Sequence, residues 1–118
     1  MEATTFDTSF ARLTKRREQL LTTLRHLDDE QAQVERNTDW VDEAAFDSRV
    51  ALLDGLRHEY LAEMRKIDRA LERIEKKEYG KCAACRAPID AKRLELVPET
   101  EHCYACAEFR EEFEQYAA

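Results

Sequence analysis

Two long apolar stripes occupy the first two thirds of this 118-residue chain. The first recurs in alternating steps of three and four residues, at Phe10, Leu13, Arg17, Leu20, Leu24, Leu27, Gln31 and Val34. The second has the same rhythm, at Phe46, Val50, Leu53, Arg57, Tyr60, Met64, Ile67, Leu71 and Ile74. Such heptad spacing places each stripe along one side of an α-helix and is typical of coiled coils. We therefore predict two long helices, whose stripes are interrupted only by Arg17, Gln31 and Arg57.

A polar break separates the stripes and provides the start of the second helix. It reads Asn37-Thr38-Asp39-Trp40-Val41-Asp42 and contains two candidate N-caps, Asp39 and Asp42. Because two helices joined by a short connection fold back on each other, we expect an antiparallel hairpin. With the turn near residue 41, the facing pairs are Leu27 with the Leu53 region, Leu20 with Tyr60, and Leu13 with Ile67. A second helix from about 46 to 78 would be roughly 50 Å long at 1.5 Å per residue.

Composition also favours helix over a sheet-rich fold. The chain has 2 Gly and 2 Pro, which leaves few residues for tight turns. Its 43% apolar and 38% charged residues can make a seam better than a thick core. Gly55 lies inside the second helix at a cost of about 1 kcal/mol relative to Ala, and the sequence assigns it no role. We predict a mainly α fold with a helical hairpin at residues 1–78 and a second region at 79–118.

Four cysteines constrain that second region. Their spacing is C-x₂-C-x₁₇-C-x₂-C, at Cys82, Cys85, Cys103 and Cys106, within the range of zinc ribbons. Two such knuckles bring four thiolates into a closed tetrahedron with Zn–S distances of about 2.3 Å. Because sulfur would fill every position, the metal would be structural, and we expect no catalytic residues. We predict one structural Zn²⁺ in a Cys₄ finger.

Other uses of the cysteines and histidines fit the sequence less well. A thioredoxin-like motif at residues 82–85 would follow a strand and begin a helix, whereas a helical pattern precedes it here. His102 could replace one sulfur as a ligand, but four cysteines already complete the shell, so we predict a surface residue. His26 and His58 have no partner pattern for catalysis.

A short amphipathic helix is expected after the last cysteine. Phe109, Phe113 and Tyr116 recur at positions that share one helix face, with glutamates around them. We predict that this face packs against the base of the hairpin and the finger.

The charge distribution disfavours an autonomous DNA-binding finger. The formal net charge is −7, and four thiolates with one Zn²⁺ would lower it by two more, to −9. Because phosphate contacts need an excess of Lys and Arg, we expect no direct DNA binding. Residues 28–47 carry eight acidic residues against Arg36 alone, whereas residues 12–17 carry four unopposed basic residues. With no N-terminal signal pattern and no apolar run of 18 residues, we expect a soluble, cytoplasmic protein without membrane contact.

Two further patterns lie at the hairpin tip and around the cysteines. The tip, residues 37–47, includes Asp39-Trp40-Val41-Asp42-Glu43-Ala44, which has the form D-x-x-D-x-A. The finger region contains, in order, Tyr79-Gly80, the first cysteine pair, Ile89, Arg93-Leu94, Pro98 and the second cysteine pair. Following a helical hairpin and preceding a terminal helix, these patterns resemble the DksA/TraR family of bacterial RNA polymerase regulators over nearly the whole chain.

The resemblance implies that the hairpin enters the secondary channel of RNA polymerase. Asp39, Asp42 and Ala44 would then act near the polymerase active site and alter promoter complexes without touching DNA. An acidic tip on a long rod suits a narrow basic or metal-containing cavity, because exclusion of water strengthens such contacts. The protein would be a non-enzymatic monomer. Helix capping and solubility are the structural alternatives for Asp39 and Asp42.

The resemblance is incomplete at the site for guanosine tetraphosphate, the nucleotide of the stringent response. The family places a Lys on the second helix, an Arg before the finger Pro and a Lys after the last Cys; here these positions read Lys66, Val97 and Ala107. Lys66 is thus a candidate nucleotide contact, but each lost charge-assisted bond is worth roughly 1.5 to 3 kcal/mol, so we expect little help from the nucleotide. The basic residues that could substitute are Arg65, Arg69, Lys92 and Arg93. Arg86 stands where the family commonly has Gly and a knuckle favours φ > 0, so we expect backbone strain there.

Two other function classes stay open at this point. A Gre-like transcript-cleavage factor also has an acidic coiled-coil tip, but it pairs Asp with Glu to hold Mg²⁺ and lacks a Cys₄ finger. A zinc-stapled adaptor that binds another protein through its helical faces needs no tip chemistry. A cleavage assay separates the first from the regulator, and co-purification with RNA polymerase separates the second.

Overall fold

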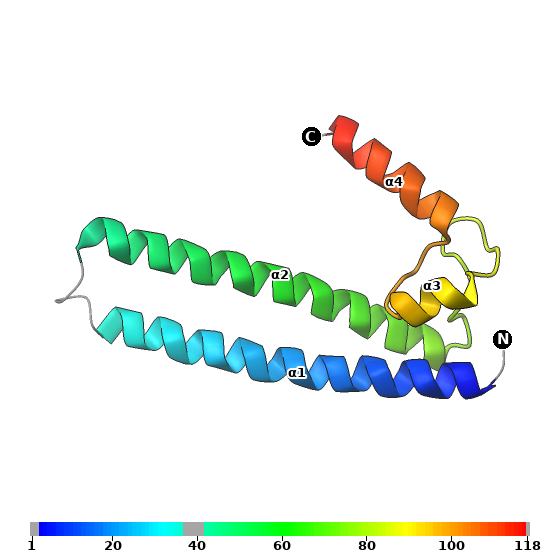
Figure 1. The fold of residues 1–118 in the computed structure, drawn as a ribbon, viewed down its shortest axis with the longest axis horizontal. Coiled ribbons are helices and arrows are strands. Elements are labelled where there is room, and N and C mark those ends of the chain that lie inside the picture. The colour runs from blue at the N-terminus through cyan, green and yellow to red at the C-terminus, as the bar shows by residue number, and fades with distance from the viewer. Residues whose placement is uncertain (1–2, 37–41, 118) are drawn as a thin grey trace. The chain divides into compact units, whose positions relative to one another are not determined.

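The computed structural model describes residues 3–36 and 42–117, with side chains for residues 7–36 and 42–110. It contains α1 (Ala3–Arg36), α2 (Glu43–Glu75), α3 (Ala91–Leu96) and α4 (Tyr104–Ala117), as Figure 1 shows. Over these residues the β-structure consists of an isolated antiparallel bridge between Lys81 and Pro88. The predicted mainly α fold is confirmed. None of the described helices combines the length and the apolar character needed to cross a membrane.

The chain forms two compact units that do not follow the order of the sequence. The hairpin unit is Lys15–Arg65, and the finger unit joins Met1–Thr14 to Lys66–Ala118. The finger unit therefore includes the beginning of α1 and the end of α2 as well as the cysteines. The predicted boundary between residues 78 and 79 divides the chain by element type instead, and it stays a prediction.

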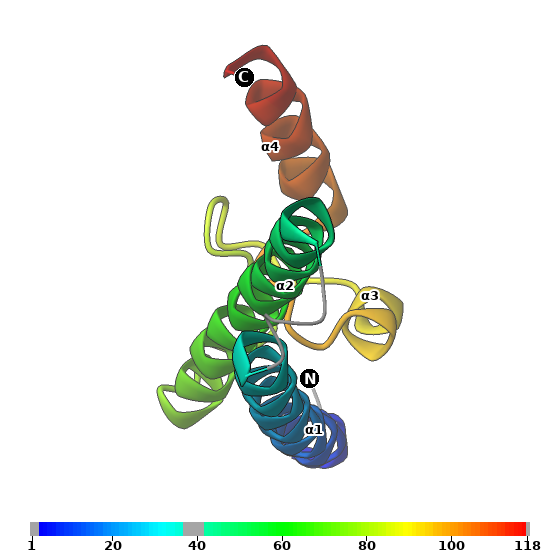
Figure 2. The ribbon, with the colours of Figure 1, turned by 90° about the vertical axis from the view of Figure 1, so that its left-hand side faces the viewer.

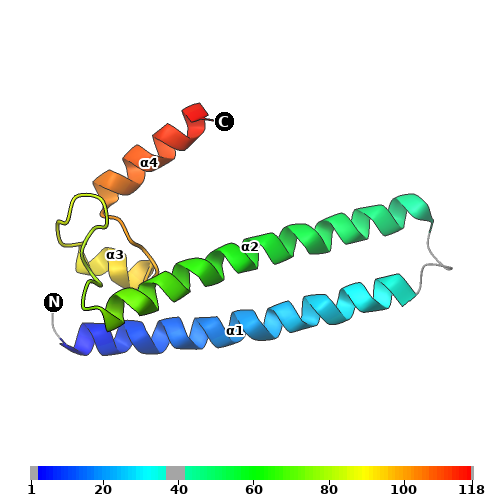
Figure 3. The same ribbon diagram turned by 180° about the vertical axis from the view of Figure 1, so that it is seen from behind.

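In the hairpin unit, α1 and α2 run antiparallel and side by side (Figures 1 and 3). Figure 2 views the same pair from the end at which α1 stops and α2 begins. Leu20, Leu27, Leu53 and Met64 are buried in this unit. Three salt bridges connect the helices in this unit: Arg16 with Glu63 at 2.7 Å, Arg49 with Glu30, and Arg57 with Asp28. The residue numbers of the first two pairs each add to 79, and those of the predicted facing pairs each add to 80, so these two salt bridges agree with the predicted register.

The start of α2 is fixed by a side-chain cap. Asp42 Oδ1 accepts a hydrogen bond from the Ala45 backbone N–H at 2.7 Å, which is the bond expected of an N-cap residue. Asp42 is therefore confirmed as one of the two candidate caps, while Asp39 lies outside the described residues. Because this cap precedes Phe46, the helix begins three residues earlier than the predicted start near 46.

The end of α2 is fixed by a residue in the left-handed region. Lys77 has φ 62°, and its N–H donates to the Ile74 carbonyl at 3.1 Å. The Glu78 N–H donates to the Arg73 carbonyl at 2.8 Å. These two bonds form a Schellman motif in which Lys occupies the position usually taken by Gly. The helix therefore stops at Glu75, before the predicted end near 78.

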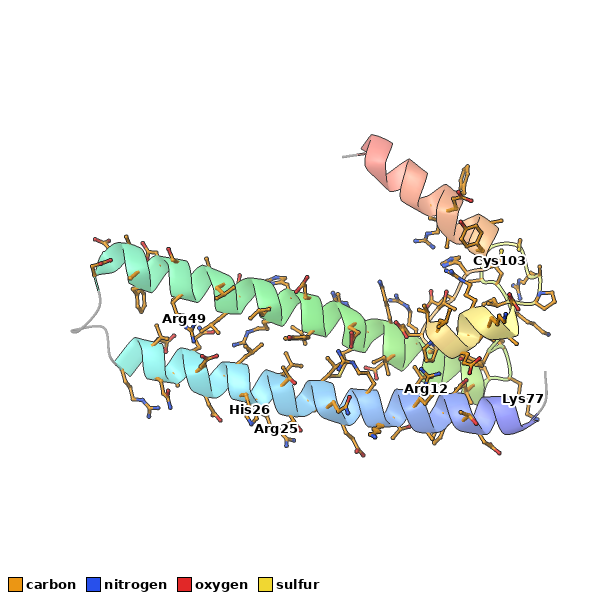
Figure 4. The ribbon with its side chains drawn as sticks, in the orientation of Figure 1. Arg12, Arg25, His26, Arg49, Lys77 and Cys103 are labelled. Carbon is orange, nitrogen blue, oxygen red and sulfur yellow. The ribbon has the colours of Figure 1, made fainter. Side chains whose placement is uncertain are left out.

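The finger unit has its own core, which links the first turns of α1 to the finger. Its buried residues are Ser9, Leu13, Ile67, Ala70, Tyr79, Cys82, Ile89 and Leu94. The Tyr79 hydroxyl donates to the Pro98 carbonyl at 2.8 Å and also bonds to the Ser9 side chain. Arg12 donates to the carbonyl of Glu95 in α3 (Figure 4). The beginning of α1 therefore helps to hold the finger.

The helix predicted after the last cysteine is present as α4, but its predicted packing is wrong for the described part. Phe109 is 68% exposed and Tyr104 is 70% exposed. The core of the finger unit is formed by residues such as Tyr79, Ile89 and Leu94 without Phe109, and Leu96 of the same unit is left 80% exposed. The side chains of Phe113 and Tyr116 lie outside the described residues.

Candidate metal centre and acidic tip

The two cysteine turns bring all four sulfurs together. The Sγ atoms of Cys82, Cys85, Cys103 and Cys106 all lie within 4.8 Å of one another. The distance between the Cys85 and Cys103 sulfurs is 3.7 Å. In a regular tetrahedron with Zn–S distances of about 2.3 Å, neighbouring sulfurs are about 3.8 Å apart. The arrangement therefore fits one tetrahedral zinc ion.

Backbone hydrogen bonds shape the first knuckle. The Cys82 N–H donates to the Ala87 carbonyl at 2.8 Å, and the Arg86 N–H donates to the Cys82 carbonyl at 3.0 Å. Arg86 has φ 68°, which confirms the positive φ predicted at this position. A side chain in the left-handed region costs roughly 1–2 kcal/mol, so the knuckle is held in this turn by the contacts around it.

The segment before the second cysteine pair is held by three parts of the finger unit. The Glu101 carbonyl accepts from the Ala83 N–H at 2.7 Å, which connects the two knuckles. The Glu101 carboxylate pairs with Arg69 of α2 at 2.5 Å. Arg93 Nε donates to the His102 carbonyl at 2.9 Å. These contacts place the third and fourth sulfurs against the first two.

His102 is half-buried, not the surface residue that the sequence predicted. Its Nε2 lies 2.8 Å from an Arg110 nitrogen, and its carbonyl accepts from Arg93. Within the described side chains, the grouped ligand atoms are the four sulfurs and do not include His102. His58 is exposed on α2 and His26 points away from α2 on α1 (Figure 4).

The pKa values of the Cys82 and Cys106 thiols are shifted in opposite directions. Burial alone would raise the pKa of Cys82, but hydrogen bonds from the backbones of Cys85, Cys103 and Ala84 and from the Cys85 side chain lower it to about 5. The opposite holds for Cys106, because hydrogen bonds with the side chains of Cys103, Cys82 and Cys85 raise its pKa to about 12. Metal ligation requires thiolates, so a divalent cation would replace the protons that these sulfurs share.

The predicted effector residues lie only partly within the described residues. Asp42 and Ala44 are exposed at the beginning of α2, and Asp39 lies outside the described residues. The Asp42 carboxylate caps the helix, and its predicted effector role stays a prediction. Capping does not remove its charge, which remains at an exposed position.

The three positions that resemble the nucleotide site all belong to the finger unit. Lys66 is exposed on α2, Val97 is the C-cap of α3, and Ala107 is half-buried in α4. Of the predicted substitutes, Arg69 and Arg93 already bond to the segment before the third cysteine. Their guanidinium groups therefore have structural partners within the finger unit.

Comparisons with known proteins agree with this geometry. A family model described as the prokaryotic dksA/traR C4-type zinc finger matches residues 77–112, which include all four cysteines. The RNA polymerase-binding transcription factor DksA of Escherichia coli (strain K12) is 32% identical over 98 residues, covering 80% of this chain and 63% of that protein. The structure of transcription factor DksA2 from Pseudomonas aeruginosa has a TM-score of 0.87 at 28% identity, covering 98% of this chain and 89% of that one. The DnaK suppressor protein from Agrobacterium tumefaciens C58 is 35% identical with a TM-score of 0.58, covering 86% of this chain and 90% of that one.

These similarities identify both the metal centre and the family. The chain spans 48% to 63% of the length of the curated relatives it matches. The four clustered sulfurs, within a matched C4-type finger, are the site of one structural zinc ion. The chain belongs to the DksA/TraR family of C4-type zinc-finger proteins.

Proposed function

We propose that this protein binds RNA polymerase and regulates transcription by inserting the acidic tip of its hairpin into the secondary channel. The observation that carries the proposal is the similarity to DksA2, which covers 98% of the chain. The tip of this chain also has the form D-x-x-D-x-A. The Escherichia coli relative is named as an RNA polymerase-binding transcription factor. In this proposal the protein is a cytoplasmic, non-enzymatic monomer that does not bind DNA directly.

The proposal divides the work between the tip and the rest of the surface. Affinity for polymerase would come from extended contacts along the protein, because buried area and a few anchor residues dominate most interfaces. The carboxylates of Asp39 and Asp42 would act locally on the channel. The exposed position of Asp42 supports this role, since its charge is accessible while its Oδ1 caps α2.

A pull-down with purified RNA polymerase, followed by promoter-complex lifetimes, tests the proposal. We expect direct binding and a changed lifetime at promoters that form short-lived complexes. A backtracked elongation complex is the control, and transcript cleavage by this protein would support a Gre-like factor instead. Absence of binding to purified polymerase would refute the proposal and leave the zinc-stapled adaptor as the better account.

We further propose that guanosine tetraphosphate adds little to this activity. Val97 and Ala107 remove two cationic contacts, and a loss of two charge-assisted bonds corresponds to about a hundredfold weaker binding or more. Promoter inhibition should therefore depend on protein concentration almost equally with and without the nucleotide. The polymerase in this assay should lack its other nucleotide site.

A gain-of-function variant sharpens that prediction. Val97→Arg combined with Ala107→Lys restores both charges in addition to Lys66, so the nucleotide should then shift the inhibition curve to lower protein concentration. A large shift already present in the unmodified protein would contradict the prediction and would show that other basic residues complete the site.

A further inference from the structure

Two of the three polar interruptions of the apolar stripes meet each other inside the hairpin unit. Gln31 interrupts the stripe of α1, and Arg57 interrupts that of α2. Arg57 Nη2 donates to Gln31 Oε1 at 3.0 Å, and its Nη1 donates to the carboxylate of Asp28. Gln31 Nε2 continues the network to Glu35 Oε1 at 3.3 Å. Two separate sequence irregularities are therefore one contact between the helices.

This network lies where the fully buried seam stops. Leu27 and Leu53 are buried at 6% and 1% exposure. Beyond them, no side chain in the described segments 28–36 and 42–52 is fully buried. A shallow hollow of about 410 Å³ opens beside Arg57, lined by Asp28, Gln31, Ala32, Glu35, Asp54 and Arg57. At this level polar side chains replace the apolar packing that joins the helices elsewhere.

Burial separates the Arg57 network from the neighbouring salt bridge. Arg49 and Glu30 also connect the helices, but both side chains are 45% exposed, and such surface pairs contribute little. The Arg57 side chain is only 28% exposed, although its partner Asp28 is 60% exposed. Its planar guanidinium makes two directed bonds across the interface, and the one to Gln31 is partly buried. A half-buried guanidinium without these partners would favour water over the seam. Arg57 is thus the stronger connection in this part of the unit.

We propose that Arg57 is a positioning residue that keeps the end of α1 and the beginning of α2 together. Arg57 would hold these helix ends together in the free protein, and this role does not depend on any partner. Its functional consequence rests on the proposed function, because Asp42 is the first residue ahead of α2 and moves with that helix. Separation of the two helix ends would leave Asp42 without a fixed place relative to α1.

Amide hydrogen exchange of the free, zinc-loaded protein tests whether Arg57 holds the two helix ends together. Arg57→Ala should raise exchange rates about tenfold or more in segments 28–36 and 43–52, with little change near Leu13 and Ile67. Arg49→Ala is the matched control and should raise the same rates less than about threefold, as expected for an exposed pair. Arg57→Lys, which keeps the charge but not the two-pronged geometry, should have an intermediate effect.

A paired apolar substitution separates positioning from charge. Gln31→Leu with Arg57→Leu fills the seam and should restore slow exchange, since a buried polar pair can be replaced by packed apolar residues. Unchanged exchange in Arg57→Ala, an equal effect of Arg49→Ala, or failure of the leucine pair to restore protection would each overturn the proposal. Because none of these measurements includes polymerase, their failure is distinct from failure of the proposed function.

Discussion

The finger unit and the hairpin unit are stabilised in different ways. In the finger unit, the buried residues come from segments far apart in the chain, such as Leu13, Ile67 and Leu94, and the same unit holds the metal centre. In the hairpin unit, two regular helices face each other along heptad stripes, with buried residues such as Leu20, Leu27 and Leu53. A structure built on a few long-range connections should fail as a whole when one is removed, whereas a single change in the hairpin should loosen only the segments around it, as proposed for Arg57.

Hydrogen bonds follow the same division. In the finger unit, side chains bond to backbone carbonyls that are distant in sequence, as Tyr79 does to Pro98 and Arg93 to His102. In the hairpin unit, the connections between helices are pairs of polar side chains, such as Arg16 with Glu63. Backbone carbonyls inside the finger cannot relocate to find other donors, so their loss should cost more than loss of a surface pair.

Removal of zinc should produce the largest difference between the units. Metal binding supplies about 10 kcal/mol or more of folding free energy in small zinc domains, so chelation or Cys82→Ser should abolish the fold around residues 79–107. The helices of Lys15–Arg65 should persist, since no ligand lies in that unit. Residue-resolved hydrogen exchange, with far-UV circular dichroism, measures both effects in the full chain.

The comparison fails if the two units respond together. Simultaneous loss of protection in the finger and throughout residues 15–65 would show that the hairpin unit depends on the metal. Purified protein with less than about half a zinc per chain, without cysteine oxidation, would also contradict the structural role of the metal.

Tyr79→Phe should have a smaller effect confined to the finger unit. The substitution removes the hydroxyl that joins Pro98 to Ser9, which is 4% exposed, and should destabilise the unit by about 1–2 kcal/mol. Urea denaturation at neutral pH measures this change. Tyr104→Phe is the matched control, because Tyr104 is 70% exposed and should give a change below about 0.5 kcal/mol.

The stability of the protein at alkaline pH is a second test of the role of Tyr79. Burial, the largest cause, raises the pKa of Tyr79 above its ordinary value, and the Glu99 charge adds to this effect. A raised pKa means that the neutral hydroxyl stabilises the fold below about pH 10 and that this contribution is lost as the pH rises through the folded value. The Phe variant should lack this loss. An alkaline transition of equal size in both proteins would assign it to another group.

Gly55→Ala should have the smallest effect, and the opposite sign. Gly55 is exposed in α2, and an added Cβ would meet nothing within 4 Å. Alanine should therefore stabilise the hairpin unit by about 0.5–1 kcal/mol through helix propensity. Thermal unfolding with zinc bound measures the change. Destabilisation by this substitution would show that α2 needs the glycine, for example to bend.

The sequence predicts the hairpin unit better than the finger unit for a physical reason. Heptad spacing depends on neighbours three or four residues away, so the stripes predict the helices and the facing pairs. Likewise, the spacing of the four cysteines predicts the metal centre. The bond between Tyr79 and Ser9 joins positions 70 residues apart, and no periodic pattern connects them. The exposure of Phe109 was missed because an amphipathic pattern marks an apolar face but not the surface that covers it.

Helix ends show the same limit on a smaller scale. Asp42 could be identified as a cap candidate from its residue type, and the structure selects it. The end at Lys77 could not be predicted, because a lysine in the left-handed region lacks the glycine that normally marks such a stop. The contact between Gln31 and Arg57 was visible only as two interruptions until the helices were paired.

Asp42→Asn is the most direct test of the proposed division between tip and affinity. Asparagine caps helices as well as aspartate does, so the start of α2 should be unchanged while the charge is removed. We expect the affinity for purified RNA polymerase to stay within about threefold of the unmodified protein, because extended contacts supply it. The effect on promoter-complex lifetime should disappear. An unchanged effect on lifetime, or a parallel loss of affinity and effect, would contradict the account.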